Sequence, residues 1–243
     1  MTGAVAEPTG ERHTQIAENL SRVRDRIASA CAESGRDPGE VTLTVVTKFF
    51  PATDVRILAG LDVHDMGENR FQEAAAKAAE TEDLGLRWHF IGNLQSNKAA
   101  AVAQYADVVE SLDRKKLLPG LSRGAQQRGA TLDCLVQVDL GSPGDRGGGR
   151  SGVATTDAVE LAGRVAEAEG LRLRGVMAVA PLDQDPALAF EKLAGVAQEI
   201  RRIDSSATWM SAGMSADLEA AIRSGATHVR VGSAVLGSRP PIK

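Results

Sequence analysis

Lys48 is the residue of this chain whose type and position best suit covalent chemistry. It follows the β-branched run VTLTVVT (41–47) and precedes two phenylalanines and a proline. If that run is a strand of a barrel, Lys48 stands at the barrel mouth beside apolar neighbours, where partial loss of water disfavours the ammonium form. An unprotonated lysine amine can form a Schiff base. Position alone leaves a second interpretation equally open, in which Lys48 pairs with an acidic residue at the barrel lip.

Two turns rich in glycine and serine near the end of the chain could hold a phosphate. The first reads Ser-Ala-Gly-Met-Ser (211–215), and the second reads Gly-Ser-Ala (232–234). Small residues let the backbone approach a phosphate, and serine hydroxyls can donate hydrogen bonds to it. Either turn alone is an ordinary loop, but two such turns opposite Lys48 favour a phosphate site.

Arg230 stands two residues from both His228 and Gly232, so all three side positions are predicted on the same face of the strand. If that face points inward, the charge of Arg230 lies at the same mouth of the barrel. There it could face the ring nitrogen of a bound pyridine. Arginine hardly ever loses its proton and would keep that nitrogen unprotonated. A neutral pyridine is a poor electron sink, which argues against strong amino-acid chemistry.

The elements that must position these residues alternate between strand and helix. Predicted strands cover 41–47, 62–66, 87–92, 106–112, 132–140, 171–179, 207–213 and 228–232, with helical stretches between them. Eight such units in roughly 200 residues predict a single (β/α)8 TIM-type barrel rather than an open doubly wound sheet. Apolar residues at helical spacing before the first strand predict an additional N-terminal helix. We expect a flexible N-terminus over 1–12 and the barrel over 13–243.

Barrel chemistry belongs at the carboxyl ends of the strands, and Lys48 is the lysine expected there. The other lysines are expected on helices, at helix starts or at the terminus, with solvated ammonium groups: Lys77, Lys98, Lys115, Lys116, Lys192 and Lys243.

Two other patterns carry less weight. The segment 141–152 contains two glycine-rich phosphate-loop patterns, but Arg150 stands where a Walker lysine is needed, and a flexible surface loop without a catalytic role is expected. His64, His89 and His228 lack carboxylate or cysteine partners at ligand spacing, so no metal site is expected.

The composition is that of an ordinary globular protein, with 43% hydrophobic and 25% charged residues and a net charge of −4. This balance predicts no nucleic-acid or membrane partner. Two distant cysteines and an N-terminus without signal-peptide character indicate a reduced, cytoplasmic protein.

The chain resembles the pyridoxal 5′-phosphate (PLP) homeostasis family, also called the proline synthetase co-transcribed family, over nearly its whole length. The segments that carry the resemblance are TVVTKFFPATDV, GENRFQE, WHFIGNLQSNK, MSAGMSADLEAAI and THVRVGSAVLGSR. Several segments in order are more specific than any one motif. The chain departs from the family in Thr47 and Phe49 beside the lysine and in Ala212, where Ser-Lys-Thr and Ser-Met-Gly-Met-Ser are usual.

The resemblance implies a fold like the N-terminal domain of alanine racemase, without that enzyme's second domain, and Lys48 as the lysine linked to PLP. It further implies that Arg230 lies near the pyridine nitrogen and that Asn69 and His89 line the ring pocket. The residues implied around the phosphate are Ser211, Gly213, Met214, Ser215, Gly232 and Ser233.

PLP on a lysine does not by itself make an enzyme. A racemase of this fold needs a second base, and the only tyrosine, Tyr105, is interpreted as packing, while Cys134 falls early in its strand. We therefore expect a PLP carrier or buffer, a monomer or weak dimer, that passes its cofactor to PLP-dependent apoenzymes. A PLP-dependent enzyme such as an amino-acid racemase is the alternative, and a Schiff-base aldolase without PLP is a more distant one.

Overall fold

The computed structural model describes residues 10–141 and 151–238. Parallel strands form a closed barrel in the order β1 (Thr42–Val46), β2 (Asp65–Glu68), β3 (Arg87–Phe90), β4 (Val108–Leu112), β5 (Leu132–Asp139), β7 (Leu171–Met177), β8 (Trp209–Ser211) and β9 (His228–Val231). The barrel closes because β9 pairs with β1. The predicted (β/α)8 barrel is confirmed, and one further strand outside the prediction, β6 (Val153–Ala154), pairs in parallel with the end of β5.

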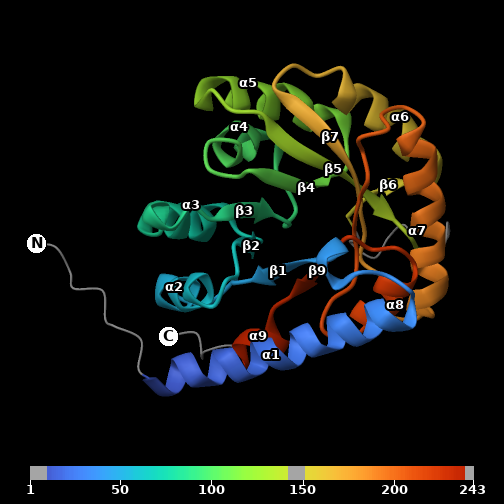
Figure 1. The fold of residues 1–243 in the computed structure, drawn as a ribbon. Helices are drawn as coiled ribbons and strands as arrows, with labels where there is room; N and C mark the ends of the chain where they lie inside the picture. The colour runs from blue at the N-terminus through green and yellow to red at the C-terminus, as the bar shows by residue number, and fades with distance from the viewer. Residues whose placement is uncertain (1–9, 142–150, 239–243) are drawn as a thin grey trace, which may run out of the picture.

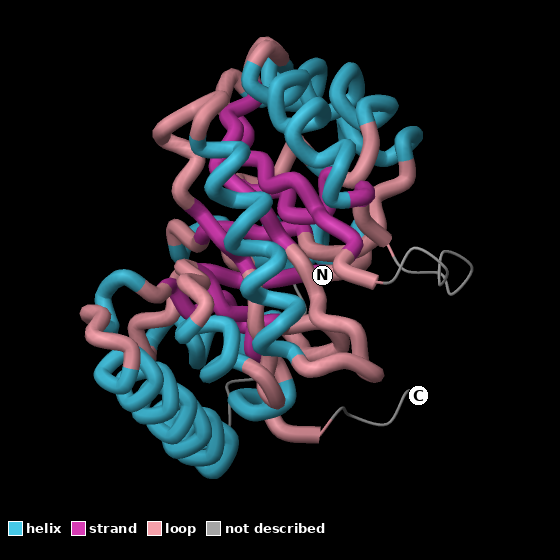
Figure 2. Tube along the Cα trace, turned by 90° about the vertical axis from the view of Figure 1, so that its right-hand side faces the viewer, coloured by secondary structure: helices cyan, strands magenta, loops and turns pink. Residues whose placement is uncertain are grey.

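Helices surround the strands, as Figures 1 and 2 show. They are α2 (Ala52–Gly60), α3 (Phe71–Glu80), α4 (Ala99–Val102), α5 (Leu118–Arg128), α6 (Thr155–Ala166), α7 (Pro186–Arg201), α8 (Leu218–Arg223) and α9 (Ser233–Leu236). Short 3₁₀ helices cover Pro38–Glu40, Glu82–Leu84, Ser96–Lys98 and Lys115–Leu117. Apolar side chains between strands and helices form the main core, as a barrel wrapped by amphipathic helices requires.

The additional N-terminal helix is α1 (Gly10–Glu33), which runs beneath the barrel beside α8 and α9 (Figure 1). Its buried face carries Ile16, Leu20, Val23 and Ile27 at helical spacing. The predicted helix is confirmed. It begins slightly before the boundary expected at residue 13, and residues 1–9 lie outside the described residues.

The second strand begins later than predicted, at Asp65 rather than at residue 62. Asp62 adopts a φ of 61°, and the Val63 N–H donates to the Leu58 carbonyl over 3.0 Å, so these residues still belong to the turn that ends α2. The correction matters for the site, because it places Asp65 at the start of β2 and Glu68 at its carboxyl end.

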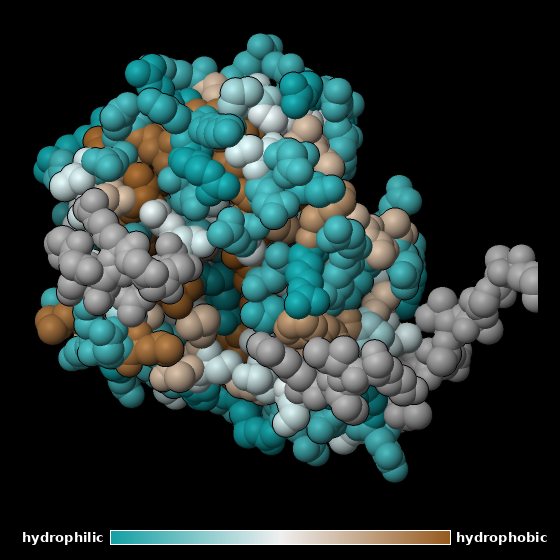
Figure 3. Space-filling model, turned by 180° about the vertical axis from the view of Figure 1, so that it is seen from behind, coloured by the Kyte–Doolittle hydropathy of each residue, from teal (hydrophilic) through white to brown (hydrophobic). Residues whose placement is uncertain are grey.

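On the face shown in Figure 3, hydrophilic residues predominate and hydrophobic ones form separate small areas. Within residues 10–141 and 151–238, every helix is too short or too polar to cross a membrane.

Candidate functional site

A pocket of about 290 Å³ contains Lys48. It lies at the carboxyl ends of β1 and β9, where the fold class places functional residues. Its lining includes these residues singled out in the sequence: Lys48, Met214, Ser215, Arg230, Gly232 and Ser233. Val46, Phe50, Ala216 and Gly237 complete it.

The pairing of β1 with β9 brings Lys48 and the second glycine-serine turn together. Val45 is in register with Val231, so the residues that follow each strand emerge side by side. A Cβ atom on Gly232 would lie 3.1 Å from the Val46 carbonyl oxygen. A larger residue would therefore push the turn away from the strand that carries Lys48.

The first glycine-serine turn is held equally tightly. Gly213 has a φ of 90°, and a Cβ atom there would lie 2.7 Å from the Ala221 Cβ and 3.0 Å from the Leu218 Cα. The Gly213 carbonyl accepts a hydrogen bond of 2.9 Å from the Arg230 N–H. Glycine at this position lets the turn lie against α8 while it remains tied to β9.

Arg230 forms the floor of the pocket. It is buried, and its guanidinium donates to the Ser211 Oγ over 2.6 Å and to the Ala178 carbonyl over 2.8 Å. Ser211 in turn donates to the Glu110 carboxylate over 2.6 Å. Burial lowers the pKa of Arg230, and the Glu110 charge opposes that shift. The guanidinium is thus fixed in direction and balanced by a buried carboxylate.

His89 lies inside the barrel, where it contacts two carboxylates. It is not among the described residues that line the pocket. Its Nδ1 is 2.7 Å from Glu110 and its Nε2 is 2.9 Å from Asp65. Burial alone would lower the pKa of His89, but the hydrogen bonds and charges of Asp65 and Glu110 raise it to about 9. Burial likewise opposes the charge of Glu110, yet its partners lower its pKa to about 2. The ring therefore supports the floor of the pocket as a cation.

Asn69 directly follows β2, and its backbone lies against Gly92, where a Cβ atom would come 2.0 Å from the Asn69 carbonyl oxygen. Asn69 is not among the described residues that line the pocket. The structure therefore places Asn69 on the neighbouring loops of the same barrel end.

The expectation of a solvated Lys77 is wrong. Its side chain is 7% exposed and its ammonium donates to Glu68 over 2.6 Å, to Glu73 over 2.7 Å and to the Thr47 carbonyl over 2.7 Å. Burial raises the pKa of Glu68, against the influence of Lys77. Neither carboxylate was singled out in the sequence, although Glu73 stands four residues before Lys77 on a predicted helix, a spacing typical of an ion pair.

Tyr105 and Cys134 do not line the pocket. Tyr105 packs against Phe71 with ring centroids 6.2 Å apart, and burial raises the pKa of its hydroxyl. Cys134 lies near the start of β5, fully buried, and burial raises the pKa of its thiol. Raised pKa values leave both groups protonated near neutrality, so neither serves readily as a base.

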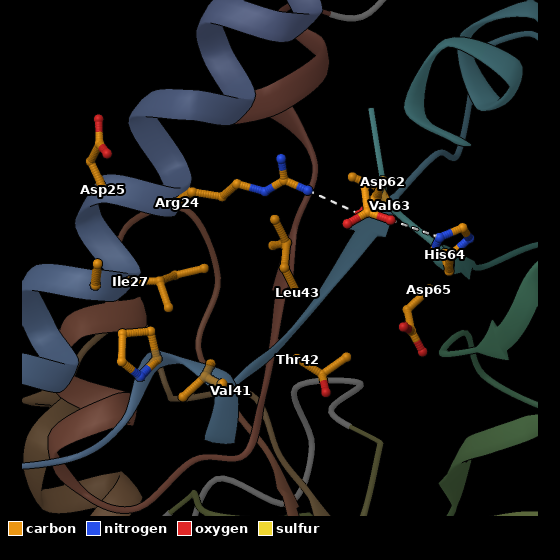
Figure 4. Close-up of a pocket in the computed structure, with 13 residues that line it drawn as sticks. Arg24, Asp25, Ile27, Val41, Thr42, Leu43, Asp62, Val63, His64 and Asp65 are labelled. Atoms are coloured by element: carbon orange, nitrogen blue, oxygen red, sulfur yellow. Dashed lines mark hydrogen bonds and ion pairs between the residues drawn. The ribbon is translucent and has the colours of Figure 1, made fainter. Parts of the chain in front are cut away.

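A larger hollow of about 550 Å³ opens at the other end of the barrel, between α1 and the start of β1 (Figure 4). Arg24 spans part of it and donates to the carbonyls of Leu61 and Asp62. The residues described as its lining include no lysine, so it offers no amine for a Schiff base. The glycine-rich patterns predicted at 141–152 lie mostly outside the described residues.

Comparison with known proteins agrees with this architecture. A family model of the alanine racemase N-terminal domain matches residues 14–240. The alanine racemase of Corynebacterium glutamicum has the same fold with a TM-score of 0.68 at 14% identity, over 95% of this chain and 63% of that one. Fold and pocket together define an α/β barrel of the alanine racemase N-terminal class.

Two relatives are more similar. The pyridoxal phosphate homeostasis protein of Mycobacterium tuberculosis is 41% identical over 246 residues, which cover 94% of this chain and 95% of the relative. The structure of PipY from Synechococcus elongatus with PLP bound has a TM-score of 0.78 at 32% identity, over 92% of this chain and 100% of PipY. The chain belongs to the pyridoxal phosphate homeostasis protein family.

Proposed function

We propose that this protein holds PLP as a Schiff base on Lys48 and acts in PLP homeostasis as a carrier or buffer. The observation that carries the proposal is the single pocket that unites Lys48, two glycine-serine turns and Arg230. An amine, two turns that accommodate a phosphate and a fixed cation match the aldehyde, phosphate and pyridine of PLP. The family relatives named for PLP homeostasis, and PipY with PLP bound, support the same assignment.

Each part of the pocket has a distinct role in this proposal. Lys48 forms the C=N bond with the aldehyde carbon and one water is released, which requires its amine to be unprotonated. The turns at Gly213–Ser215 and Gly232–Ser233 hold the phosphate through backbone and hydroxyl groups, without the expected hydroxyl of Ser211, which is buried and bonded to Glu110 and Arg230. Arg230 faces the ring nitrogen and donates directly to Ser211, while Ser211 and His89 both contact Glu110. Asn69 borders the ring from the β2 loop.

Bound PLP supplies an electron sink for amino-acid chemistry, and the protein groups around the ring determine how strong that sink is. Among the described lining residues, the side chains that ionise readily are Lys48 and Arg230. Arg230 keeps a proton away from the ring nitrogen, so it weakens the sink. A second base for racemisation would have to come from elsewhere. These features favour holding and releasing PLP over turnover of amino acids.

Release reverses the capture step. Water attacks the C=N carbon, the Lys48 amine leaves, and the aldehyde is restored. We propose PLP-dependent apoenzymes as the recipients, and a monomer or weak dimer as the form that delivers PLP.

Three measurements test the proposal. Purified protein mixed with PLP should develop an absorbance band near the visible edge, and borohydride reduction followed by peptide mapping should place the label on Lys48. Lys48→Ala should lose both signals. PLP should then pass to an apoenzyme without solvent deuterium entering Cα of added amino acids at catalytic rates. Label on another lysine, or rapid deuterium exchange, contradicts the carrier.

A further inference from the structure

Glu68, Glu73 and Lys77 form a cluster of ion pairs. The residues directly before and after Lys48 are both hydrogen-bonded to this cluster. On one side, the Thr47 carbonyl accepts a hydrogen bond of 2.7 Å from the Lys77 ammonium, and the Thr47 hydroxyl donates to Glu68 over 2.6 Å. On the other side, the Phe49 N–H donates to Glu73 over 2.5 Å. The ammonium of Lys77 contacts both carboxylates, so one cluster holds the backbone before and after Lys48.

The backbone at Phe49 needs such support. Phe49 has a φ of 73°, a conformation that bulky residues rarely adopt. This left-handed residue turns the chain sharply directly after Lys48, and the Phe50 N–H closes the turn on the Thr47 carbonyl over 3.0 Å. A strained conformation persists where the surroundings impose it, and such residues gather at functional sites.

The cluster is strong enough to impose that conformation. Lys77 and Glu68 are almost wholly buried, with side chains 7% and 1% exposed, and Glu73 is 23% exposed. The buried Lys77 ammonium is hydrogen-bonded on three sides, to Thr47, Glu68 and Glu73, and it allows little movement, because any displacement leaves a charge unpaired in a medium of low dielectric constant. None of these three residues lines the described pocket, so they reach the cofactor site only through the backbone of residues 47–49.

We propose that Glu73 and Lys77 are positioning residues for Lys48, which hold the strained turn so that the amine projects toward the aldehyde of PLP. The inference rests on the proposed function and adds the device that aims the reacting amine. It concerns the bond to the aldehyde and leaves the phosphate turns, which follow β8 and β9, untouched.

A pair of ligands separates aiming of the amine from general damage to the pocket. PLP binds through both its phosphate and its aldehyde, whereas pyridoxine 5′-phosphate keeps the ring and phosphate but has no aldehyde. The variants are Glu73→Leu, which removes the acceptor for the Phe49 N–H, and Glu73→Gln, which keeps an acceptor but removes the charge opposite Lys77. Glu80→Gln, on the exposed side of the same helix α3, is the matched control.

We expect Glu73→Leu to weaken PLP binding about tenfold, a loss typical of one charge-assisted hydrogen bond. Glu73→Gln should lose less, Glu80→Gln should match the wild type, and all variants should bind pyridoxine 5′-phosphate as the wild type does. The fraction of bound PLP that borohydride fixes to Lys48 should fall in the same order. Melting curves of the free proteins identify any variant that is unfolded, and Glu73→Gln then carries the test.

Equal loss of affinity for both ligands, or unchanged affinity for PLP, overturns the positioning role. These outcomes differ from failure of the proposed function, in which the wild type itself forms no Schiff base on Lys48.

Discussion

The Nδ1 atom of His89 lies 2.7 Å from the Oε1 atom of Glu110, and both side chains are shielded from solvent inside the barrel. Glu110 uses its second oxygen to accept from Ser211, which accepts in turn from Arg230. The pair therefore links the start of β2, through Asp65, to the floor of the proposed cofactor pocket.

Replacement of Glu110 should destabilise the fold. Glu110→Gln leaves His89 and Arg230 without their shared buried counter-charge, and breaking a buried pair costs about 3 kcal/mol or more. Urea unfolding of the variant should show a correspondingly lower midpoint. Glu80→Gln, at an exposed position, should change stability by less than about 0.5 kcal/mol. A Glu110→Gln protein as stable as the wild type would show that the pair contributes little.

Stability should fall as the pH rises from neutral. The folded state holds the His89 proton up to a pKa of about 9, whereas the unfolded chain releases it near 6.5. The stabilisation is therefore complete below pH 6.5 and is lost as the pH approaches 9, amounting to about 3 kcal/mol. In Glu110→Gln the pKa of His89 drops, so its stability should decline less over this range. Unfolding measured at both ends of the range in both proteins checks the difference.

The pKa values of the two buried histidines should be shifted in opposite directions. Burial lowers the pKa of His228 to about 4, while the carboxylates around His89 raise its pKa. Ring NMR signals at neutral pH should thus report a neutral His228 beside a protonated His89, whose ring centroids lie 6.3 Å apart. Two rings that titrate together near pH 6.5 would contradict the assignment.

Gly213→Ala should impair PLP binding more than it impairs folding of the barrel. An alanine at a φ of 90° is strained, and its Cβ would press on Ala221 and Leu218. The turn must move, at a cost of about 1–3 kcal/mol. Titrations should show weaker binding of both PLP and inorganic phosphate. Gly195→Ala, in the exposed part of α7 where a Cβ meets open space, is the control and should bind normally.

The additional helix α1 should contribute to cofactor affinity. Arg26 donates to the Ser215 carbonyl over 3.0 Å and to Glu219 over 2.7 Å, so it braces the first phosphate turn from outside. These groups are partly exposed, so Arg26→Ala should cost less than about 1 kcal/mol of stability and weaken PLP binding about two- to fivefold. Arg22→Ala, one turn earlier and bonded to Asn19 of its own helix, should leave PLP binding unchanged.

The sequence predicts the barrel well because alternation of β-branched runs with helical stretches is a local signal. It misplaces β2 because Asp62 takes a positive φ, which its residue type permits but does not require. It also misses β6, whose two residues are too few to show any periodicity.

The site is predicted less completely. Lys48, the two turns and Arg230 meet in one pocket, since strand order alone brings the ends of β1, β8 and β9 together. Glu110 is missed because a charged residue within an apolar run gives no sign of its partner, whereas the burial of Lys77 is missed although its spacing from Glu73 is typical of an ion pair. Glu110 meets Ser211 across 101 positions of sequence, and only the closed barrel creates that contact.

Closure of the barrel by β1 and β9 also has a consequence for biosynthesis. Thr42 pairs with His228, so β1, which directly precedes Lys48 and pairs with β2 on its other side, gains its second neighbour only after the ribosome has reached β9. A nascent polypeptide displays the reactive lysine long before it possesses Gly232 and Ser233. Capture of the vitamin-derived cofactor in the proposed pocket must therefore follow translation of the last strand, and an incomplete chain cannot sequester it.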